Sequence, residues 1–256
     1  MTNIKTKICL AVFIIILLAT VNLQAAIRDG EKLTFSISYG VIKAAEATLE
    51  IKSDTLNDTP VWLITSNAKT YPFFDSVFKV RDVVQSWWEK ENLRSLRYSK
   101  RLNEGTYRQH RIHYYDHENN TSLYRRWNLK KQTFRDKQIP IPENTQDILS
   151  AFYLTRQQSL SPGSRFLIDV TTDGDTYKTE VIVHRRETID SIFGKKSCLV
   201  IEPKLKGEAV FKQSGRILIW ITDDEHKVPL KMTSKITFGA FTANLIDAQN
   251  VPYARK

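Results

Sequence analysis

The stretch KLTFSISY, Lys32–Tyr39, decides the fold class of this chain, because its apolar and polar residues alternate strictly. Successive side chains of a β-strand point to opposite faces, so a period of two predicts a strand with one buried face. The apolar members of the stretch are Leu33, Phe35, Ile37 and Tyr39.

The same alternation returns along the rest of the chain, and turn-forming segments separate the runs. Further strands are therefore predicted around residues 47–51, 166–170, 181–183 and 217–221. The turns between runs are expected at Tyr39-Gly40, Thr172–Asp175, Phe193–Lys196 and Thr222–Lys227.

One segment follows a helical pattern instead. Asn144 or Thr145 can cap a helix, and Pro162 with Gly163 can end the segment. Its apolar face would consist of Ile148, Leu149, Phe152 and Tyr153.

A dozen or more strands in one sheet do not stay flat, because the twist between neighbouring strands accumulates. We therefore predict an all-β, mainly antiparallel fold: a curled sheet, or an incomplete or closed β-barrel, with one short covering helix. Such a barrel is either filled by its own side chains or open to a ligand, and the sequence leaves both alternatives open.

Residues 71–101 begin with aromatic residues and end in arginines and lysines. Pro72 suits the first turn of a short helix that contains Phe73 and Phe78, and Val80–Glu89 can alternate as a strand. One continuous helix also fits the apolar spacing, but the β-branched and aromatic content favours the strand. Most of these aromatic residues are expected in the core.

Trp87 and Trp88 are neighbours and should face opposite sides of that strand, so one is expected in the core and the other outside or at a rim. A Trp beside Arg94, Arg97 and Arg101 would form an amphipathic rim where a lipid or a sugar could rest.

The first 26 residues have the pattern of an export signal. Lys5 and Lys7 precede an apolar run that ends at Thr20, and small residues follow at Ala25 and Ala26, where cleavage is expected. An uncleaved membrane anchor is the alternative, but the run has about 14 residues where a spanning helix needs about 20. We therefore expect a periplasmic protein.

Export would remove Cys9 and leave Cys198 as the single cysteine, so no internal disulfide can form. Stability then depends on a hydrophobic core, and residues 27–256 suffice for one β domain without a linker. Cys198 lies in an apolar run and is interpreted as a buried structural thiol.

The positive charge is concentrated in one part of the chain. Residues 94–137 contain twelve Lys and Arg against four Asp and Glu, a net +8, and Lys5 and Lys7 supply the rest of the total of +10. Such a strip attracts phosphates, nucleic acid or anionic lipids. An exported protein meets little nucleic acid, which leaves anionic lipid, lipopolysaccharide or acidic glycan as expected partners. The alternative is a set of solvated strand faces kept soluble by charge.

Two groups of polar residues resemble catalytic or metal sites but are interpreted otherwise. His110, His113 and His117 would share one face of a helix, but on a strand His110 points away from the other two. Asp223 and Asp224 lie in a good turn sequence, which favours a turn over an acid/base pair. No catalytic residue, metal or cofactor is predicted.

Four segments, taken together, resemble the exported bacterial family named domain of unknown function 3108. The resemblance covers nearly the whole mature chain, and it implies an exported, mostly β protein without implying any chemistry. The segments are GEKLTFSISYG (Gly30–Gly40), FFDSVFKVRD (Phe73–Asp82), DILSAFYLTR (Asp147–Arg156) and WITDDEHKVPLKM (Trp220–Met232).

The sequence thus predicts a periplasmic, non-enzymatic β protein that binds an amphipathic or anionic envelope molecule, with peripheral membrane contact. Apolar parts of the ligand would enter the concave face, and acidic groups would meet the basic strands. The alternatives are an envelope assembly scaffold without a cavity, or a glycan-processing enzyme. The predicted ligand-binding residues are Trp87, Trp88, Arg94, Arg97, Arg101, Arg108, Arg111 and Arg126.

Overall fold

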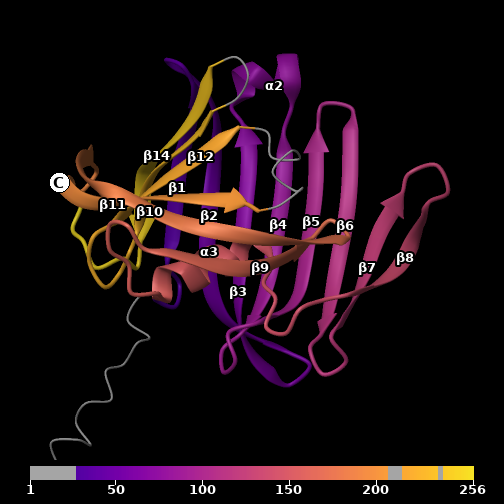
Figure 1. Ribbon diagram of the computed structural model, residues 1–256. Coiled ribbons are helices and arrows are strands. Elements are labelled where there is room, and N and C mark those ends of the chain that lie inside the picture. Colours follow the sequence, from indigo (N-terminus) through magenta and orange to yellow (C-terminus); the bar gives the residue numbers. More distant parts are fainter. Residues whose placement is uncertain (1–26, 207–214, 236–238) are drawn as a thin grey trace, which may run out of the picture.

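The computed structural model describes residues 27–206, 215–235 and 239–256. The predicted export signal, residues 1–26, and its cleavage position lie outside these ranges. Within the described residues, fourteen strands form one antiparallel sheet in the order β8-β7-β6-β5-β4-β3-β2-β1-β14-β13-β12-β11-β10-β9 (Figure 1).

The strands and helices have the following bounds. The strands are β1 (Lys32–Tyr39), β2 (Ile42–Leu56), β3 (Thr59–Thr70), β4 (Arg81–Glu89), β5 (Ser95–Glu104), β6 (Tyr107–Asp116), β7 (Thr121–Asn128), β8 (Thr133–Pro140), β9 (Arg165–Thr172), β10 (Asp175–Ser191), β11 (Gly194–Leu205), β12 (Arg216–Thr222), β13 (Pro229–Lys235) and β14 (Ala240–Gln249), and the helices are α2 (Pro72–Phe78) and α3 (Ile148–Gln157).

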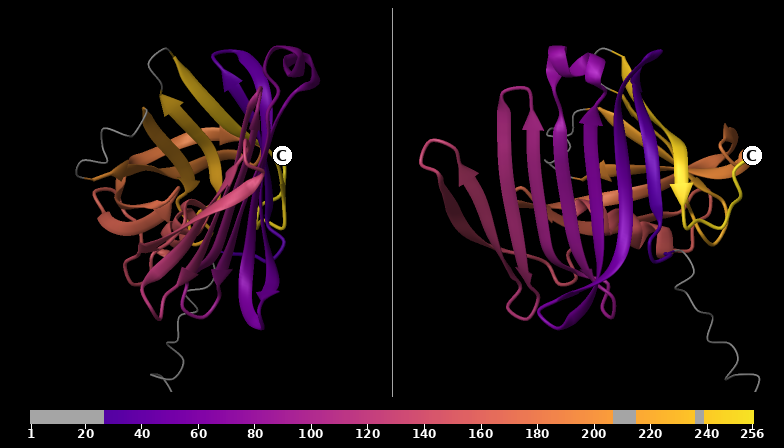
Figure 2. Two further views of the ribbon diagram at one scale, coloured as in Figure 1. Left: turned by 90° about the vertical axis from the view of Figure 1, so that its right-hand side faces the viewer. Right: turned by 180° about the vertical axis from the view of Figure 1, so that it is seen from behind.

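The sheet curls but does not close. β8 and β9 are its two edge strands, and they are not hydrogen-bonded to each other. The left view of Figure 2 shows the two halves of the sheet as facing layers, with the strands of the C-terminal half on the left and those of the N-terminal half on the right. The prediction of an all-β antiparallel curled sheet is confirmed, in its incomplete rather than closed form.

The alternating strand Lys32–Tyr39, β1, lies in the middle of the sheet. β1 pairs with β2 on one side and with β14 on the other, so the first and last strands of the chain are joined through it. Leu33 is fully buried on one face of β1 and belongs to a core cluster with Val200, Trp220 and Leu245. Cys198 is buried in the same cluster, as predicted.

The predicted covering helix is α3, but its cap differs from the prediction. Asp147, and neither Asn144 nor Thr145, is the N-cap residue. Its carboxylate accepts hydrogen bonds from the backbone N–H groups of Leu149 and Ser150, which satisfies the free donors of the first turn. The prediction failed because all three polar residues are good caps, and local sequence does not rank them.

α3 fills the lower part of the space between the two halves of the sheet. Tyr153 is fully buried against Ile51, Ile64 and Trp88 of the N-terminal half. Phe152 contacts both this cluster and the cluster of the C-terminal half. The face of β2–β5 that α3 covers is therefore the concave face of the sheet.

The predicted short helix before β4 is α2, and the predicted strand after it is β4, so that division of residues 71–89 is confirmed. The expectation that most aromatic residues here are core is wrong for the helix. Phe73 is 79 % exposed, Phe78 is 53 % exposed, and α2 has no buried residue. α2 lies at the ends of β3 and β4, and no described strand or helix is layered over it (Figure 1). Neither helix among the described residues has the length and apolar character needed to cross a membrane.

Candidate functional site

The concave face contains a group of small side chains, which we call the hollow: Ala45 and Ala47 of β2, and Ser66 and Ala68 of β3. The register places Ala47 opposite Ala68, so this cross-strand pair carries no large side chain. Larger side chains border the pair, because Phe35 of β1 lies opposite Ala47 and Leu49 of β2 lies opposite Ser66. All four residues are partly exposed, although they lie on the same face as the buried Ile51 and Ile64. α3 packs against Ile51 and Ile64 in the lower half of this face, and the hollow lies further along β2 and β3, toward α2.

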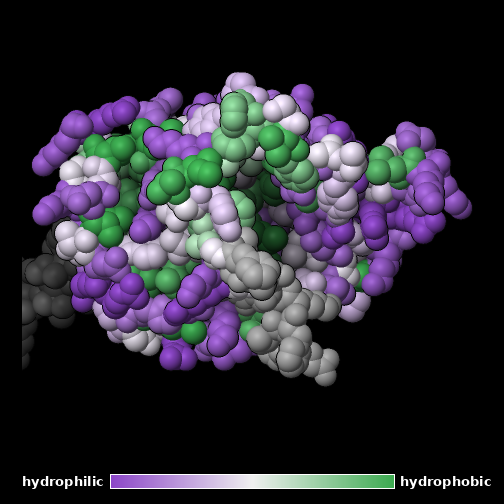
Figure 3. All heavy atoms as spheres, turned by 90° about the horizontal axis from the view of Figure 1, so that it is seen from above, coloured by the Kyte–Doolittle hydropathy of each residue, from purple (hydrophilic) through white to green (hydrophobic). Residues whose placement is uncertain are grey.

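Seen from above, the molecule is hollowed near its centre, with hydrophobic residues around the opening (Figure 3). Protein interiors are normally packed without gaps, so a group of small, partly exposed side chains on a concave face is a feature that needs a reason. A small curled sheet with such a face can hold one small ligand.

The same concave face continues into a line of cations across four strands, which we call the basic row: Lys100, Arg111, Arg126 and Arg135. Each member is the direct cross-strand partner of the next, from β5 through β6 and β7 to β8. The row adjoins the hollow, because Ser66 pairs with Val84 and Val84 pairs with Lys100.

Like charges directly opposite one another destabilise a sheet, so this arrangement requires anions nearby. Asp173, in the turn between β9 and β10, supplies one: its Oδ2 lies 2.5 Å from Lys100 Nζ and its Oδ1 lies 2.9 Å from Arg111 Nη1. Burial alone would lower the pKa of the Arg111 guanidinium, but the Asp173 carboxylate raises it. No carboxylate among the described residues forms an ion pair with Arg126 or Arg135, which are exposed.

The turn that carries Asp173 is held in place by contacts across the barrel. The N–H of Gly174 donates a hydrogen bond to His113 Nε2 at 3.2 Å, and the hydroxyl of Tyr115 donates to the carbonyl of Thr171 at 2.7 Å. Gly174 has a φ of +88°, and a Cβ at this position would lie 2.8 Å from the ring of Tyr124. Only glycine fits there without strain.

The predicted site residues are divided between the two faces of the sheet. Arg111 and Arg126 belong to the basic row on the concave face, and Trp88 is fully buried in the core on that face. On the outer face, Trp87 packs against Arg97, whose guanidinium carbon lies 4.5 Å from the ring centroid and 5.3 Å from that of Tyr114. The prediction that the two Trp residues face opposite sides, one in the core, is confirmed.

The other three predicted residues lie apart from the basic row. Arg94 is in the turn between β4 and β5, where its Nε lies 2.7 Å from Glu89 Oε2. Arg101 is exposed on the outer face of β5. Arg108 is exposed near the turn between β5 and β6 and donates to the carbonyls of Gly105 and Tyr107. These arginines are close to the basic row in the sequence, but the strand register places them away from it in the structure.

Lys100, Arg135 and the hollow were not among the predicted site residues. The two-residue period of a strand would have placed Lys100 and Arg111 on the concave face. Each lies two residues from a buried residue of that face, Tyr98 for Lys100 and His113 for Arg111. Their alignment with Arg135 depends on the registers of three successive hairpins, which the sequence does not specify.

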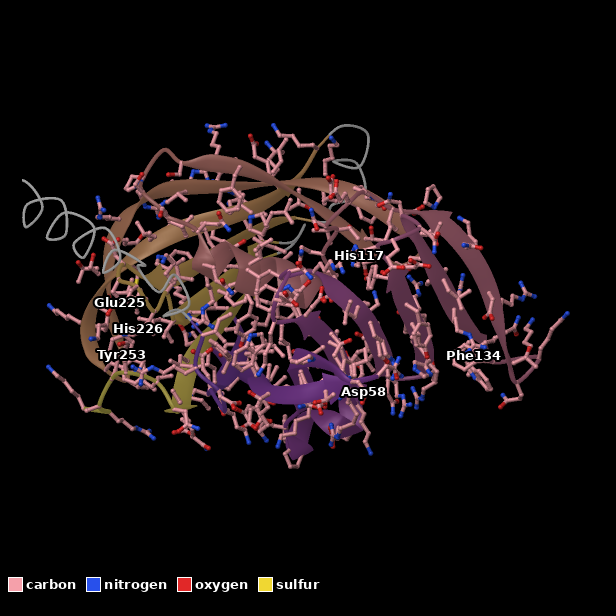
Figure 4. All side chains as sticks on the ribbon, turned by 90° about the horizontal axis from the view of Figure 1, so that it is seen from below. Asp58, His117, Phe134, Glu225, His226 and Tyr253 are labelled. Carbon is pink, nitrogen blue, oxygen red and sulfur yellow. The ribbon has the colours of Figure 1, made fainter. Side chains whose placement is uncertain are left out.

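The histidines and acidic residues that resemble catalytic groups form hydrogen bonds within the fold. His113 and His117 are buried on the concave face, where His117 Nε2 bonds to the carbonyl of Ser95 at 2.6 Å. Asp224 lies in the predicted turn and accepts hydrogen bonds from the backbone of His226 and Lys227. Figure 4 shows Glu225, His226 and Tyr253 together on one side of the molecule, away from His117 and Phe134. Within residues 27–206, 215–235 and 239–256, no three His, Cys, Asp or Glu side chains are grouped to hold a metal ion.

Comparisons with known proteins identify the family and the fold. A family model described as "Protein of unknown function (DUF3108)" matches residues 34–246. No curated protein matches the chain. Among solved structures, a β-barrel-like protein of domain of unknown function DUF1849 from Brucella abortus aligns with a TM-score of 0.55 and 8 % identity, over 87 % of this chain and 99 % of that chain. This likeness shows a shared fold.

Two further structures align with lower scores. A candidate exported protein with a YmcC-like fold from Bacteroides fragilis has a TM-score of 0.32 and 8 % identity, over 87 % of this chain and 97 % of that chain. A candidate lipoprotein from Parabacteroides distasonis has a TM-score of 0.35 and 7 % identity, over 87 % of this chain and 96 % of that chain.

Proposed function

The chain belongs to the DUF3108 family of proteins of unknown function, and from its concave face we propose that it is an exported envelope protein that binds an amphipathic anion without changing it chemically. The observation that supports this proposal is the adjacency of the hollow and the basic row on one face. An apolar chain would lie in the hollow, and an acidic head group would meet Arg126 and Arg135.

The dimensions of the face suit such a molecule. The hollow lies on β2 and β3 and Arg126 lies on β7, so four strand spacings, about 19 Å, separate β3 from the first unpaired cation. An apolar hollow favours a lipid or lipopolysaccharide over a glycan, because a glycan brings hydroxyl groups that small apolar side chains cannot satisfy.

The proposed location is the periplasm, with the export signal cleaved near Ala25 or Ala26. The short apolar run after Lys5 and Lys7 supports this part of the proposal. Sequencing the N-terminus of the purified protein tests it, and a chain that still begins at Met1 on the membrane would contradict it.

A test of the hollow uses a fluorescent fatty acid, cis-parinaric acid, and two pairs of substitutions. Ala47→Phe with Ala68→Phe fills the concave side of a cross-strand pair, and Thr48→Phe with Asn67→Phe places the same rings on the opposite side of the sheet, at the adjacent cross-strand pair. We expect the first variant to weaken binding by more than about tenfold, or about 1.4 kcal/mol, and the second to change it little. Equal effects of the two variants would contradict a ligand in the hollow.

A second test concerns the head group. Arg126→Gln with Arg135→Gln removes two exposed charges from the concave face, and Arg101→Gln with Arg108→Gln removes two from the outer face of neighbouring strands. We expect only the first variant to weaken binding and to reduce its dependence on salt, because only those arginines face the ligand. Loss of binding in both variants to the same degree would indicate general charge attraction.

One observation favours an enzyme as a second candidate. Asp82 and Glu104 lie on the concave face, and Asp82 is the cross-strand partner of Ala68 in the hollow. Burial raises the pKa of the Glu104 carboxyl, and the charge of Asp82 and a hydrogen bond with it raise it further. Two carboxyl groups that share a proton can act as acid and base. Turnover of a lipid or glycan that is lost in both Asp82→Asn and Glu104→Gln, with folding unchanged, would establish this candidate.

A further inference from the structure

The upper end of the barrel presents a group of exposed apolar side chains, which we call the apolar rim: Val41, Ile42, Phe73, Val77 and Phe78. Val41 is 97 % exposed, Phe73 is 79 % exposed and Val77 is 77 % exposed. Figure 3, which views the molecule from above, shows hydrophobic residues around the opening. Single exposed apolar residues are ordinary, but a contiguous group marks an interaction surface.

Backbone hydrogen bonds bring together the segments that carry the rim residues. The N–H of Tyr71, just before α2, donates to the carbonyl of Ala44, just after the turn between β1 and β2, at 3.1 Å. The other end of α2 is tied to the next hairpin, because the N–H of Gly105 donates to the carbonyl of Lys79 at 2.7 Å. A Cβ on Gly105 would lie 2.8 Å from the ring of Phe78.

α2 is held by polar contacts that leave its apolar side chains outside. Asp75 accepts a hydrogen bond from the Thr70 hydroxyl at 2.5 Å, and its carboxylate lies 2.5 Å from Arg81 Nη2. α2 buries none of its residues, so Phe73 and Val77 contribute little to the core. Removing such side chains from water is favourable, and folding alone does not use this free energy.

The charges at the rim select the class of partner. Lys43 and Lys79 are exposed beside Ile42 and Phe78, and the carboxylate of Asp75 is occupied by Arg81. Anionic lipid surfaces bind proteins that combine two features: apolar side chains that insert at the interface, and lysines that contact the head groups. A protein partner with an acidic, apolar surface would offer the same chemistry on a smaller area.

We propose that the apolar rim docks on the surface of an anionic phospholipid leaflet. The rim borders the hollow, since Ala45 follows the rim residue Ile42 by three residues on β2. Docking would therefore bring the opening of the barrel to the membrane. This proposal does not rest on ligand binding in the hollow, because the rim residues are different and lie outside it.

The test is flotation of the mature protein with vesicles of phosphatidylglycerol and phosphatidylcholine, and with phosphatidylcholine alone. The rim variant carries Val41→Ser, Phe73→Ser and Val77→Ser. The control carries Leu123→Ser, Leu129→Ser and Leu167→Ser, which removes three exposed apolar side chains outside the rim. We expect the rim variant to lose at least roughly tenfold in vesicle binding and the control less than about twofold.

A second variant tests the charges. Lys43→Gln with Lys79→Gln should weaken binding to the anionic vesicles and leave binding to neutral vesicles unchanged, and the control is Lys178→Gln with Lys204→Gln, two exposed lysines elsewhere. Circular dichroism and cis-parinaric acid binding show whether each variant is folded and whether the hollow still functions. A rim variant that binds the acid normally but no longer floats supports docking independently of the proposed function.

Three results would overturn the proposal. The first would be that the folded wild-type protein does not float with the anionic vesicles at low salt. The second would be that the rim and control variants lose binding equally. The third would be that the wild-type protein forms dimers that prevent flotation and that the rim variant does not form, which would make a second copy the partner of the rim.

Discussion

Arg156 and Glu31 form an ion pair that is closed to solvent, with Arg156 Nη1 2.6 Å from Glu31 Oε1 and Nη2 2.8 Å from Oε2. Arg156 lies near the end of α3 and Glu31 directly precedes β1, so the pair joins segments 125 residues apart. Arg156 Nη2 also donates to the carbonyl of His226, between β12 and β13. At the other end of α3, the Asp147 carboxylate accepts hydrogen bonds from Ser86 and Ser95. α3 thus ties the two halves of the curled sheet together.

Removing one member of the buried pair should destabilise the protein strongly. Glu31→Gln or Arg156→Met leaves the other charge buried without its partner, which costs about 3–5 kcal/mol. The measurement is the free energy of unfolding in urea. The control is Arg185→Gln, which breaks an exposed pair with Glu187 and should cost less than about 1 kcal/mol.

The double variant Glu31→Gln with Arg156→Met distinguishes a buried pair from a packing effect. It leaves no unpaired charge, so it should cost less than the sum of the single changes. Single changes no more costly than Arg185→Gln would show that the pair does not hold the sheet together.

His113 should remain neutral in the folded protein far below neutral pH. Its Nε2 accepts from Gly174 and its Nδ1 lies 3.0 Å from the Ser122 hydroxyl, so the neutral ring satisfies both contacts. Burial lowers the pKa of His113 from 6.5 to about 4. The unfolded chain therefore binds the proton first as pH falls, and this contribution to stability is complete above about pH 6.5 and is lost between about 6.5 and 4.

The loss over that range should be on the order of 3 kcal/mol for this one group. NMR titration of the His113 ring tests the cause directly, and the slope of unfolding free energy against pH tests the consequence. A ring that titrates near 6.5 in the folded protein would show that the contact with Gly174 is not as described.

The two acidic residues of the turn after β12 should have structural effects only. Asp224 Oδ1 accepts from the Thr222 hydroxyl at 2.9 Å and from the N–H of His226 at 3.0 Å, so Asp224→Asn should cost about 1–2 kcal/mol. Asp223 contacts the largely exposed Arg186, and Asp223→Asn should cost less than about 1 kcal/mol. Urea unfolding measures both, and loss of fatty-acid binding by either variant without unfolding would contradict the structural interpretation.

The sequence predicted the strands well because their signal is local. Alternation at Leu33 and Phe35 predicts a half-buried strand wherever that strand pairs, and Pro72 predicts the start of α2 from its fixed φ alone. The curled sheet was predicted from the number of strands alone, without knowing which strands pair. Asp147 was not predicted as the N-cap of α3, because its carboxylate also accepts hydrogen bonds from Ser86 and Ser95, which are distant in the sequence.

The site could be predicted only in part, because it depends on register. Arg97 and Arg111 belong to the same basic segment of the sequence, yet the first lies on the outer face and the second on the concave face. A shift of one residue in a hairpin would exchange them. The hollow was not predicted for a different reason. An alanine in a strand does not indicate an unfilled space until the residue opposite it is known to be small as well.

The most direct test of the central claim is native mass spectrometry of the protein purified in mild conditions from the envelope of the cells that export it. The account predicts one bound amphipathic anion per chain, identified after extraction, and its absence from the Ala47→Phe, Ala68→Phe variant prepared in parallel. The Thr48→Phe, Asn67→Phe variant should keep it. A wild-type protein that carries no such molecule and takes up none from an extract of envelope lipids, or a filled variant that carries as much as the wild type, would contradict the claim.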